Sequence, residues 1–319
     1  MPCETLRSWG EILSHFVGEA PKCISGRNGR CLRELFLTGI YCVMKSVGLS
    51  ASFSRAAHSY YYIRNAENGA IMSKIIAVTS GKGGTGKSSI CSELGFALAK
   101  QGHRTLIIEL DFGLRCLDIM LGVKNDIKYD LGNVLKGECD IYQATTQVKI
   151  ATNLSIVCAP EDPFARVDAE TIKNICQEMR KYYEYIIVDT SAGTNASVFD
   201  VVEQSDLILI NTTPDPVCVR DARTMSDEFY KRGNKKQRLI INKVNPDLFK
   251  ADLVVDLDEI IDTVGVQLIG VIPDDDAVII ATSKGEPLPS SSLAFKAFDA
   301  ISKRIKGEDV PLSFKVLLQ

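Results

Sequence analysis

A loop rich in glycine and lysine holds the residues of this chain that are best suited to chemistry. In order, its residues are Gly81, Lys82, Gly83, Gly84, Thr85, Gly86, Lys87 and Ser88. The run fits the pattern G-x-x-x-x-G-K-[ST] and carries an additional lysine at its second position. Glycines permit positive φ angles, which let backbone N–H groups of such a loop approach phosphate oxygens. The loop therefore predicts a site for the phosphates of a nucleotide.

The side chains at the end of the loop suit a triphosphate and its magnesium ion. Lys87 can bring a mobile positive charge to the β- and γ-phosphates. The Ser88 hydroxyl can supply one oxygen ligand to Mg²⁺, and Ser89 can hydrogen-bond an α-phosphate oxygen. The alternative, a surface turn that happens to contain Gly and Lys, does not explain why these residues stand at this spacing.

Two aspartates follow apolar, β-rich runs elsewhere in the chain. Asp111 follows residues 105–110, and Asp189 follows residues 185–188. Ligands of open α/β sheets bind at the carboxyl ends of the strands, so we expect both carboxylates beside the loop. Asp189 would hold Mg²⁺ through water, and Asp111, also at the metal, would orient the attacking water. Without the loop, either aspartate would as readily be a helix cap or a turn residue.

These residues need a parallel sheet to bring them together, and the chain has the pattern for one. Seven β-rich runs alternate with helix-compatible stretches, at residues 74–79, 105–110, 154–158, 185–188, 207–210, 239–241 and 268–272. The run Leu207–Ile210 is continuously apolar, which is typical of a strand covered on both faces. We therefore predict an α/β fold with a doubly wound, mostly parallel sheet flanked by helices.

Composition and charge narrow the class of protein. The chain of 319 residues has a net charge of −3. Residues 1–71 contain eight Lys or Arg and five Glu, a net charge of +3, which leaves −6 for residues 72–319. A mildly acidic body disfavours broad electrostatic binding of nucleic acid.

The ten cysteines form no C-x-x-C pair, which favours reduced thiols in the cytosol.

The chain divides into three predicted parts. Residues 1–71 show poor periodicity, and we expect an extension that is disordered or not natively translated. Met72 stands directly before the first predicted strand, which favours the second alternative, whereas five Glu argue against a targeting peptide. Residues 72–306 form the predicted nucleotide-binding domain, and residues 307–319 form a tail. No uncharged run is long enough to cross a bilayer, so we predict a cytoplasmic protein, soluble or peripheral at the inner face of the membrane.

Several motifs together resemble the MinD/ParA family of ATPases, whose phosphate loop carries an early lysine in the place of Lys82. The resemblance extends over roughly residues 73 to 306. Beyond the loop it rests on four segments: DFGLRCLD at 111–118, DTSAG at 189–193, VRDA at 219–222 and VIPDD at 271–275. The Gly-Leu-Arg triplet and the Leu-Asp pair of the first segment favour the MinD branch over the plasmid-partition branch.

The resemblance implies a P-loop NTPase fold of the SIMIBI type and a Mg²⁺-dependent ATPase that forms a homodimer when ATP is bound. It implies that Lys82 reaches across the dimer to the nucleotide of the other copy. From the residues alone, Lys82 is equally well a solvated surface charge. The resemblance also implies that Asn242, Pro273 and Asp274 contact the adenine base.

For function, the resemblance implies control of the placement of the cell-division septum, together with protein partners of the division-site system. A chromosome or plasmid partition ATPase and a regulator of flagellar placement are alternatives within the same family. An iron–sulfur carrier is a further alternative, and the missing C-x-x-C pair argues against such a cluster. The acidic body makes nucleic acid an unfavoured partner.

Some positions depart from the family pattern. Glu109 stands where many relatives have Asp, Cys116 where they have Asn, and Ser191 where they have Pro. None of these changes removes a charged group that the mechanism needs, but we expect the geometry around them to differ. Relatives that cycle on membranes end in a basic amphipathic helix, whereas residues 310–319 contain one lysine. Peripheral membrane contact therefore stays an open alternative.

Overall fold

The computed structural model describes residues 73–112, 115–162, 164–165, 167–193, 196–234, 236–251 and 256–312. The extension predicted at residues 1–71 lies outside the described residues, as do residues 313–319 of the predicted tail. The described helices and strands run from Lys74 to Lys306.

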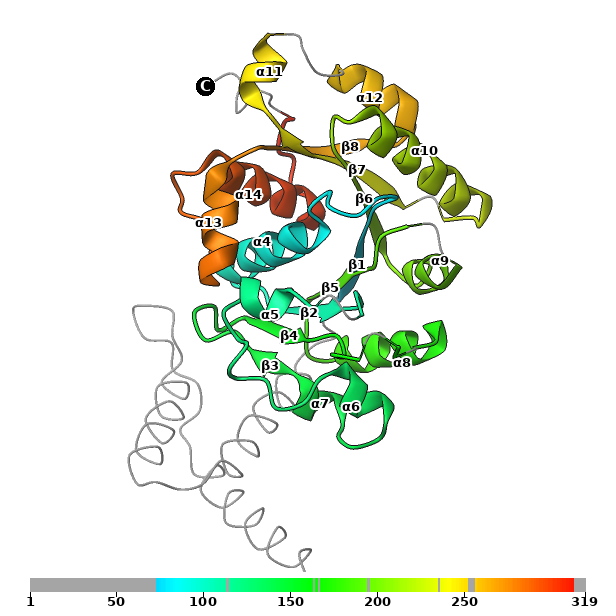
Figure 1. The fold of residues 1–319 in the computed structure, drawn as a ribbon, viewed down its shortest axis with the longest axis vertical. Coiled ribbons are helices and arrows are strands. Elements are labelled where there is room, and N and C mark those ends of the chain that lie inside the picture. Colours follow the sequence, from blue (N-terminus) through cyan, green and yellow to red (C-terminus); the bar gives the residue numbers. More distant parts are fainter. Residues whose placement is uncertain are drawn as a thin grey trace, which may run out of the picture. The chain divides into compact units, whose positions relative to one another are not determined.

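A sheet of eight strands forms the centre of the fold, in the order β3-β4-β2-β5-β1-β6-β7-β8 (Figure 1). The strands are β1 (Lys74–Thr79), β2 (Thr105–Glu109), β3 (Thr146–Gln147), β4 (Leu154–Val157), β5 (Tyr185–Asp189), β6 (Leu207–Thr212), β7 (Gln237–Val244) and β8 (Leu268–Pro273). All neighbouring strands are parallel except the pair β3 and β4. The predicted doubly wound, mostly parallel sheet is therefore confirmed.

The seven predicted runs coincide with the seven parallel strands, with differences at their ends. The largest difference is at β7, which extends beyond the predicted residues 239–241 to Gln237–Val244. Its ends are polar, so the apolar pattern showed only its centre. The short antiparallel strand β3, Thr146–Gln147, was not predicted, because two residues are too few to show a period.

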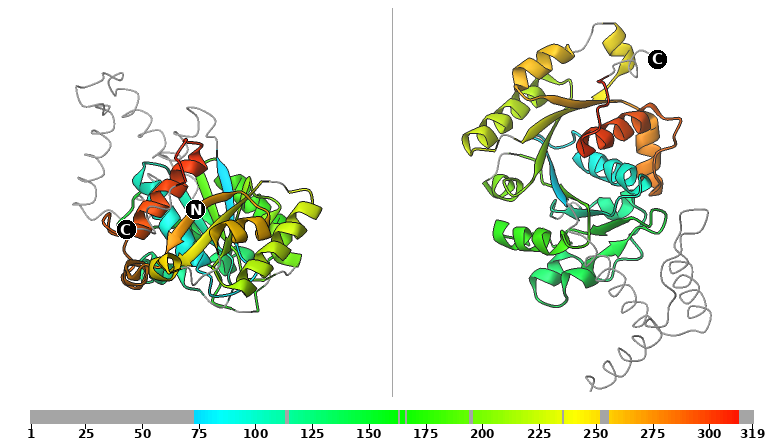
Figure 2. Two further views of the ribbon diagram at one scale, coloured as in Figure 1. Left: turned by 90° about the horizontal axis from the view of Figure 1, so that it is seen from above. Right: turned by 180° about the vertical axis from the view of Figure 1, so that it is seen from behind.

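Helices cover both faces of the sheet (Figures 1 and 2). They are α4 (Lys87–Lys100), α5 (Leu117–Met120), α6 (Leu131–Leu135), α7 (Ile141–Ala144), α8 (Ala169–Met179), α9 (Ala196–Val202), α10 (Pro216–Lys231), α11 (Pro246–Lys250), α12 (Leu257–Val264), α13 (Asp276–Lys284) and α14 (Leu293–Lys306). One core cluster joins α4 and α14 to one face of the strands. Two further clusters join α9, α10 and α12, and separately α8, to the opposite face.

Strand β6 illustrates how the sequence sets these layers. Leu207 and Leu209 belong to the core that contains α4, whereas Ile208 and Ile210 belong to the core that contains α10. Successive side chains of a strand point to opposite faces, so a run that is apolar throughout feeds both cores. The continuous apolar character of this segment therefore follows from helices on both sides.

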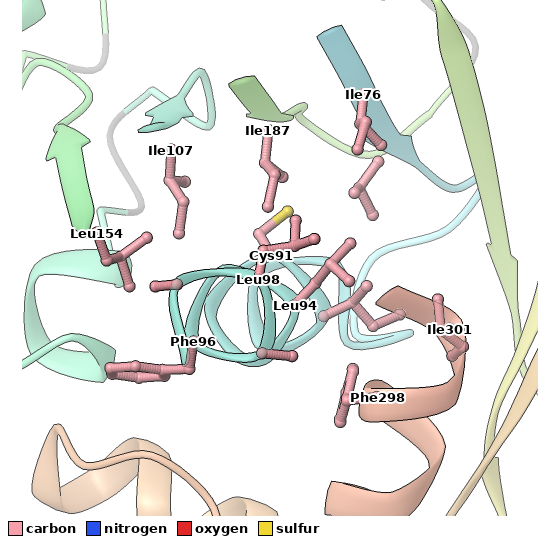
Figure 3. Close-up of a cluster of buried hydrophobic side chains, with 14 of the residues drawn as sticks. Ile76, Cys91, Leu94, Phe96, Leu98, Ile107, Leu154, Ile187, Phe298 and Ile301 are labelled. Carbon is pink, nitrogen blue, oxygen red and sulfur yellow. The ribbon is translucent and has the colours of Figure 1, made fainter. Parts of the chain in front are cut away.

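Helix α4, which follows the phosphate loop, lies between the sheet and α14 (Figure 3). Ile76, Ile107 and Ile187 line the strand side of this cluster, and Phe298 and Ile301 line the α14 side. A helix enclosed on several sides is apolar around most of its circumference, as α4 is. This packing fixes the helix start, and hence the end of the loop, relative to the strands.

The described part of the C-terminal tail lies against α14. Gly307 ends the helix with a φ angle of 92°, and the Arg304 side chain donates to the carbonyls of Val310 at 2.9 Å and Pro311 at 2.7 Å. Across the described residues, no helix combines the length and the apolar character that crossing a membrane requires.

Candidate nucleotide site

The phosphate loop, residues 81–88, follows the central strand β1, and its last two residues begin helix α4. Gly84 and Gly86 have φ angles of 80° and 94°, in the left-handed region that favours glycine. A Cβ atom at Gly86 would also lie 2.5 Å from the side-chain nitrogen of Asn242. Gly86 is thus required both by its backbone angle and by its neighbour. Lys87 begins the helix and is only 6% exposed.

Lys82 lies at the exposed tip of the loop with Gly83 and Gly84. Its carbonyl oxygen accepts hydrogen bonds from Ser80 Oγ at 2.7 Å and Thr85 Oγ1 at 3.5 Å. These bonds hold the backbone of the tip while its side chain faces outward. The predicted role of Lys82 across a dimer stays a prediction, and the exposure of its side chain is compatible with that role.

Side chains at the carboxyl ends of β6 and β7 bind two consecutive carbonyl oxygens of the loop. Asn211 Nδ2 and Asn242 Nδ2 both donate to Thr85 O, at 2.9 and 2.8 Å. Lys243 Nζ donates to Gly84 O at 2.9 Å. The amide nitrogen of Asn242 thus supports the phosphate loop, and the predicted contact of Asn242 with adenine stays a prediction.

Asn211 and Lys243 are candidates that sequence reasoning missed. Asn211 is 1% exposed inside the apolar strand β6, and a buried amide needs a hydrogen-bond partner. Lys243 directly follows the predicted Asn242. A polar residue at the carboxyl end of a buried strand is the signal that could have found both.

Asp189 is the last residue of β5, and its carboxylate is fully buried. Neither carboxylate oxygen has a hydrogen-bond partner among the described residues. Burial raises the pKa of Asp189 to about 7, although the nearby Ser88 hydroxyl and Lys87 ammonium act in the opposite direction. The Ser88 hydroxyl lies near the Asp189 carboxylate but forms no hydrogen bond with it in this arrangement. A buried carboxylate that lacks formed hydrogen bonds is costly unless a cation or a cation-bound water compensates it.

Asp111 is half-buried and stands two residues beyond the end of β2. Burial raises the pKa of Asp111, while the Lys87 ammonium lowers it. Leu110 N donates to Asp189 O at 2.8 Å, so Asp111, the next residue, follows at the same edge of the sheet, and its charge contributes to the raised pKa of Asp189. The structure thus brings Lys87, Ser88, Asp111 and Asp189 to one edge of the sheet. Ser89 lies in the first turn of α4 beside them.

These residues fit a magnesium ion that is held jointly with a nucleotide. In the part of the chain that the structure describes, no three His, Cys, Asp or Glu side chains converge as a metal-binding group. Such an ion would take the Ser88 hydroxyl, phosphate oxygens and waters oriented by Asp189, which is the oxygen-rich set that Mg²⁺ prefers. The buried, unpartnered carboxylate of Asp189 is the observation that favours this arrangement.

Glu109, the last residue of β2, holds the segment that carries Asp111 in place through hydrogen bonds. Its Oε1 accepts from Cys116 N at 2.9 Å and Leu117 N at 3.1 Å, and its Oε2 accepts from Ala159 N at 3.2 Å. Burial raises the pKa of Glu109, and the three N–H donors lower it. A glutamate in this position therefore joins the loop after β2 to the loop after β4, a role that sequence reasoning did not predict.

Arg115 lies in the segment after β2 and forms ion pairs with carboxylates in that segment and in two other parts of the chain. Its guanidinium, 11% exposed, lies 3.2 Å from the carboxylate of Asp118, 3.7 Å from that of Asp130 and 3.6 Å from that of Glu161. Asp130 also caps α6, and Glu161 lies in the loop after β4. The sequence singled out Arg115 as part of a motif but did not predict these distant partners.

The other two departures from the family pattern also lie near the loop. Cys116 stands beside Ser88, and burial raises the pKa of its thiol to about 11 against the opposing effect of the Ser88 hydroxyl. Ser191 is half-buried, and its carbonyl accepts from Thr190 Oγ1 at 3.1 Å. Two residues later, Gly193 N donates to Ser80 O at 3.0 Å, so this segment returns to the start of the phosphate loop.

The residues predicted to contact adenine gather at the ends of β7 and β8. Pro273 is buried at the end of β8, and Asp274 is exposed directly after it. Asp274 N donates to Val244 O at 2.9 Å, which places this turn two residues from Asn242. The structure therefore brings Asn242, Pro273 and Asp274 together beside the phosphate loop, while their contact with a base stays a prediction.

Comparison with known proteins gives a consistent result. The chain matches the family model of the CobQ/CobB/MinD/ParA nucleotide binding domain over residues 76–288. It is 36% identical over 244 residues to the septum site-determining protein MinD of Synechocystis sp., covering 75% of this chain and 92% of that protein. MinD of Bacillus subtilis is 36% identical over 246 residues, 76% of this chain and 92% of that protein. A chain of the MinC:MinD cell division complex of Aquifex aeolicus superimposes with a TM-score of 0.71 at 30% identity, covering 76% of this chain and 99% of that one.

Proposed function

The chain belongs to the CobQ/CobB/MinD/ParA family of nucleotide-binding proteins, and from this membership we propose that it is a MinD-like ATPase that helps to place the division septum. ATP binding would join two copies, and hydrolysis would separate them. The observation that carries this proposal is the loop with Lys82 and Lys87 beside the buried, unpartnered carboxylate of Asp189.

Binding of the triphosphate is the first step that the geometry supports. Backbone N–H groups of a glycine-rich loop at a helix start attract phosphate oxygens, and the buried Lys87 ammonium adds a full positive charge. The Ser88 hydroxyl and Asp189 would hold Mg²⁺, which when bound neutralises charge on the phosphates. Asn242, Pro273 and Asp274 would contact the base.

Hydrolysis needs an oriented water and charge stabilisation at the γ-phosphate. Asp111 lies at the correct edge of the sheet, and Glu109 fixes the segment behind it. Lys82, exposed at the loop tip, would complete the site of the other copy in a dimer. The site of one copy alone would then hydrolyse ATP slowly, which makes hydrolysis depend on dimer formation.

Similarity to septum site-determining MinD proteins favours division over the alternatives of partition and flagellar placement. The solved relative from Aquifex aeolicus is a complex of MinC with MinD, so a protein partner of the division system is the expected partner here. The net charge of −6 on residues 72–319 further disfavours the DNA retention that a partition ATPase needs.

The dimer is tested by measuring molar mass in solution with light scattering after size exclusion. Asp111→Ala, which is expected to bind ATP without hydrolysing it, should elute as a dimer with Mg²⁺ and ATP and as a monomer with ADP. Adding Lys87→Ala to this variant should leave it monomeric with either nucleotide. A monomer under saturating ATP would contradict the proposal.

The cellular role is tested with a fluorescent fusion in the cells that contain the protein. Localisation at the poles or at mid-cell that is lost in Lys87→Ala supports the role in division. Coating of the nucleoid would instead support partition, and a diffuse signal that is unchanged in the variant would contradict both roles.

A further inference from the structure

We propose that Lys243 is a positioning residue of the nucleotide site, which acts by holding the peptide bond between Gly84 and Thr85. The inference rests on the proposed function, since it concerns the same phosphate loop. Lys243 Nζ donates to Gly84 O at 2.9 Å from the carboxyl end of β7, which lies two strands from β1 in the sheet. Its side chain is exposed, so burial does not account for this placement.

The backbone at Lys243 is unfavourable for a residue with a side chain. Its φ angle of 55° is the one positive value that a non-glycine residue adopts among the described residues. The register between β7 and β8 shifts between Ile241 and Val244, which marks a bulge around Lys243. Bulges redirect side chains, and left-handed conformations of residues other than glycine concentrate at functional sites. Here the redirected side chain ends on the phosphate loop.

The bond to Gly84 O has a direct consequence for the loop, because a trans peptide unit is planar and its C=O and N–H groups point in opposite directions. Lys243 Nζ, at the end of β7, donates to Gly84 O, so this carbonyl points toward β7 and the N–H of Thr85 points away from it. In the same way, the two asparagine amides on Thr85 O turn the N–H of Gly86 away from β6 and β7. Neither N–H donates to a protein acceptor within the described chain. Both are available to phosphate oxygens.

The two carbonyls differ in how securely they are held. Thr85 is 2% exposed, and its carbonyl accepts from two buried amides, so the loss of one leaves the other. Gly84 is exposed, and a Cβ atom there would meet nothing within 4 Å. Lys243 is the single side chain that bonds the Gly84 carbonyl among the described residues. The orientation of this peptide unit therefore depends on one ammonium group.

The test measures the affinity for ADP with Mg²⁺ by calorimetry, and thermal stability in parallel. Lys243→Met removes the ammonium and keeps the left-handed backbone, whereas Lys243→Gly removes both the ammonium and the conformational cost. We expect both variants to bind ADP about fivefold to tenfold more weakly. Lys243→Arg keeps a charged donor and should stay within about twofold of the unmodified protein.

Stability separates a positioning role from a structural one. Because glycine accepts a positive φ, Lys243→Gly should have a thermal midpoint no lower than that of the unmodified protein, although it binds ADP more weakly. A residue that only stabilised the fold would lose affinity and stability together. Weaker binding together with a clearly lower midpoint in Lys243→Gly would therefore count against the inference.

Lys236→Met is the matched control, since it removes the same charge from an exposed position at the other end of β7. It should bind ADP as the unmodified protein does. The inference is overturned if the Met and Gly variants of Lys243 bind ADP normally, or if Lys236→Met is weakened equally. If the unmodified protein binds no ADP, the proposed function itself fails, which is a different result from normal binding in all variants.

Discussion

The phosphate loop and the segment that carries Asp111 lie at the same edge of the sheet, yet different interactions hold them. On the loop side, the neutral amides of Asn211 and Asn242 donate to one backbone carbonyl, and glycine conformations set the turn. On the other side, the carboxylate of Glu109 accepts three backbone N–H groups, and the guanidinium of Arg115 lies among three carboxylates.

Because of this difference, we expect the two regions to differ in how strongly salt and pH affect them. Buried hydrogen bonds between neutral groups depend little on salt or pH, whereas ion pairs and buried carboxylates depend on both. We therefore expect the Thr85 carbonyl, which the two amides hold, to keep its place under most conditions, whereas the Gly84 carbonyl depends on the exposed Lys243 ammonium. The Asp111 segment should respond to its surroundings, which suits a protein in which binding and hydrolysis occur at different stages.

The largest expected effects come from one substitution in each region, which separates nucleotide binding from hydrolysis. Lys87→Ala should weaken ADP binding by about 100-fold or more, because a buried charge on the phosphates is lost. Asp111→Asn should keep ADP affinity within about threefold while ATP hydrolysis falls by about 100-fold. Calorimetry and phosphate release measure the two effects.

Lys100→Ala, at the other end of α4, is the control for Lys87→Ala and should bind ADP normally. The comparison fails if Asp111→Asn loses binding and hydrolysis in equal proportion. In that case the two regions would form one unit, and no division into binding and hydrolysis would be justified.

The next effect in size concerns Glu109. Glu109→Gln replaces an acceptor oxygen by an amide donor, so at least one of three buried N–H groups loses its partner, at a cost of about 1–3 kcal/mol. We expect faster hydrogen exchange at Cys116, Leu117 and Ala159, slower ATP hydrolysis, and ADP affinity close to normal. Glu259→Gln, on the exposed side of α12, controls for the lost charge. Unchanged exchange at the three amides would show that Glu109 does not hold the segment.

Glu93 is a buried carboxyl in α4, the helix that begins at the end of the phosphate loop. It tests whether pH can change the stability of the fold without changing nucleotide binding. Burial raises the pKa of Glu93 from 4.5 to about 7, partly offset by the N–H of Leu288. The folded state therefore keeps the proton that the unfolded state releases, and the free energy of unfolding decreases as pH rises from 4.5 to 7. Glu93→Gln lacks this loss, so it should be more stable at pH 8 by about 1–3 kcal/mol.

At pH 4.5 and below, both forms of the protein carry a neutral side chain at this position, so their difference should become small. Urea unfolding at several pH values measures it. An advantage of Glu93→Gln that does not change between pH 5 and pH 8 would contradict the assignment of a raised pKa. ADP affinity should be unaffected, because Glu93 bonds the loop before α14 and not the phosphate loop.

The smallest expected effect is at Arg115. Arg115→Met removes partly buried ion pairs, which contribute about 1 kcal/mol in low salt and less in high salt. The thermal midpoint should fall by about 2–4 °C at low salt and by less in 1 M NaCl. A midpoint difference that is independent of salt would mean that packing, and not charge, makes Arg115 important.

The sequence predicted the fold well because the informative residues are local. Each parallel strand is a short apolar run, and the runs of β1 and β6 are apolar because helices cover both faces. The loop has a fixed spacing, and Asp111 and Asp189 could be placed because both follow strands. These features depend on neighbours in the chain and need no knowledge of strand order.

The contacts that the sequence did not predict depend on which strands become neighbours in the sheet. Asn211 and Lys243 reach the loop only because β6 lies beside β1 in the sheet and β7 lies beside β6. The partners of Glu109 and Arg115 include Ala159 and Asp130, which a different strand order would move away. Apolar periodicity gives the existence of a strand but not its place in the sheet, so these contacts could not be predicted.

The most direct test of the central claim is a calorimetric titration of ATP into the unmodified protein in the presence of Mg²⁺. We predict a saturable heat with about one site per chain, absent in Lys87→Ala and retained in Lys100→Ala. No heat from properly folded protein would contradict the claim that this loop binds a triphosphate, and with it the proposed switch.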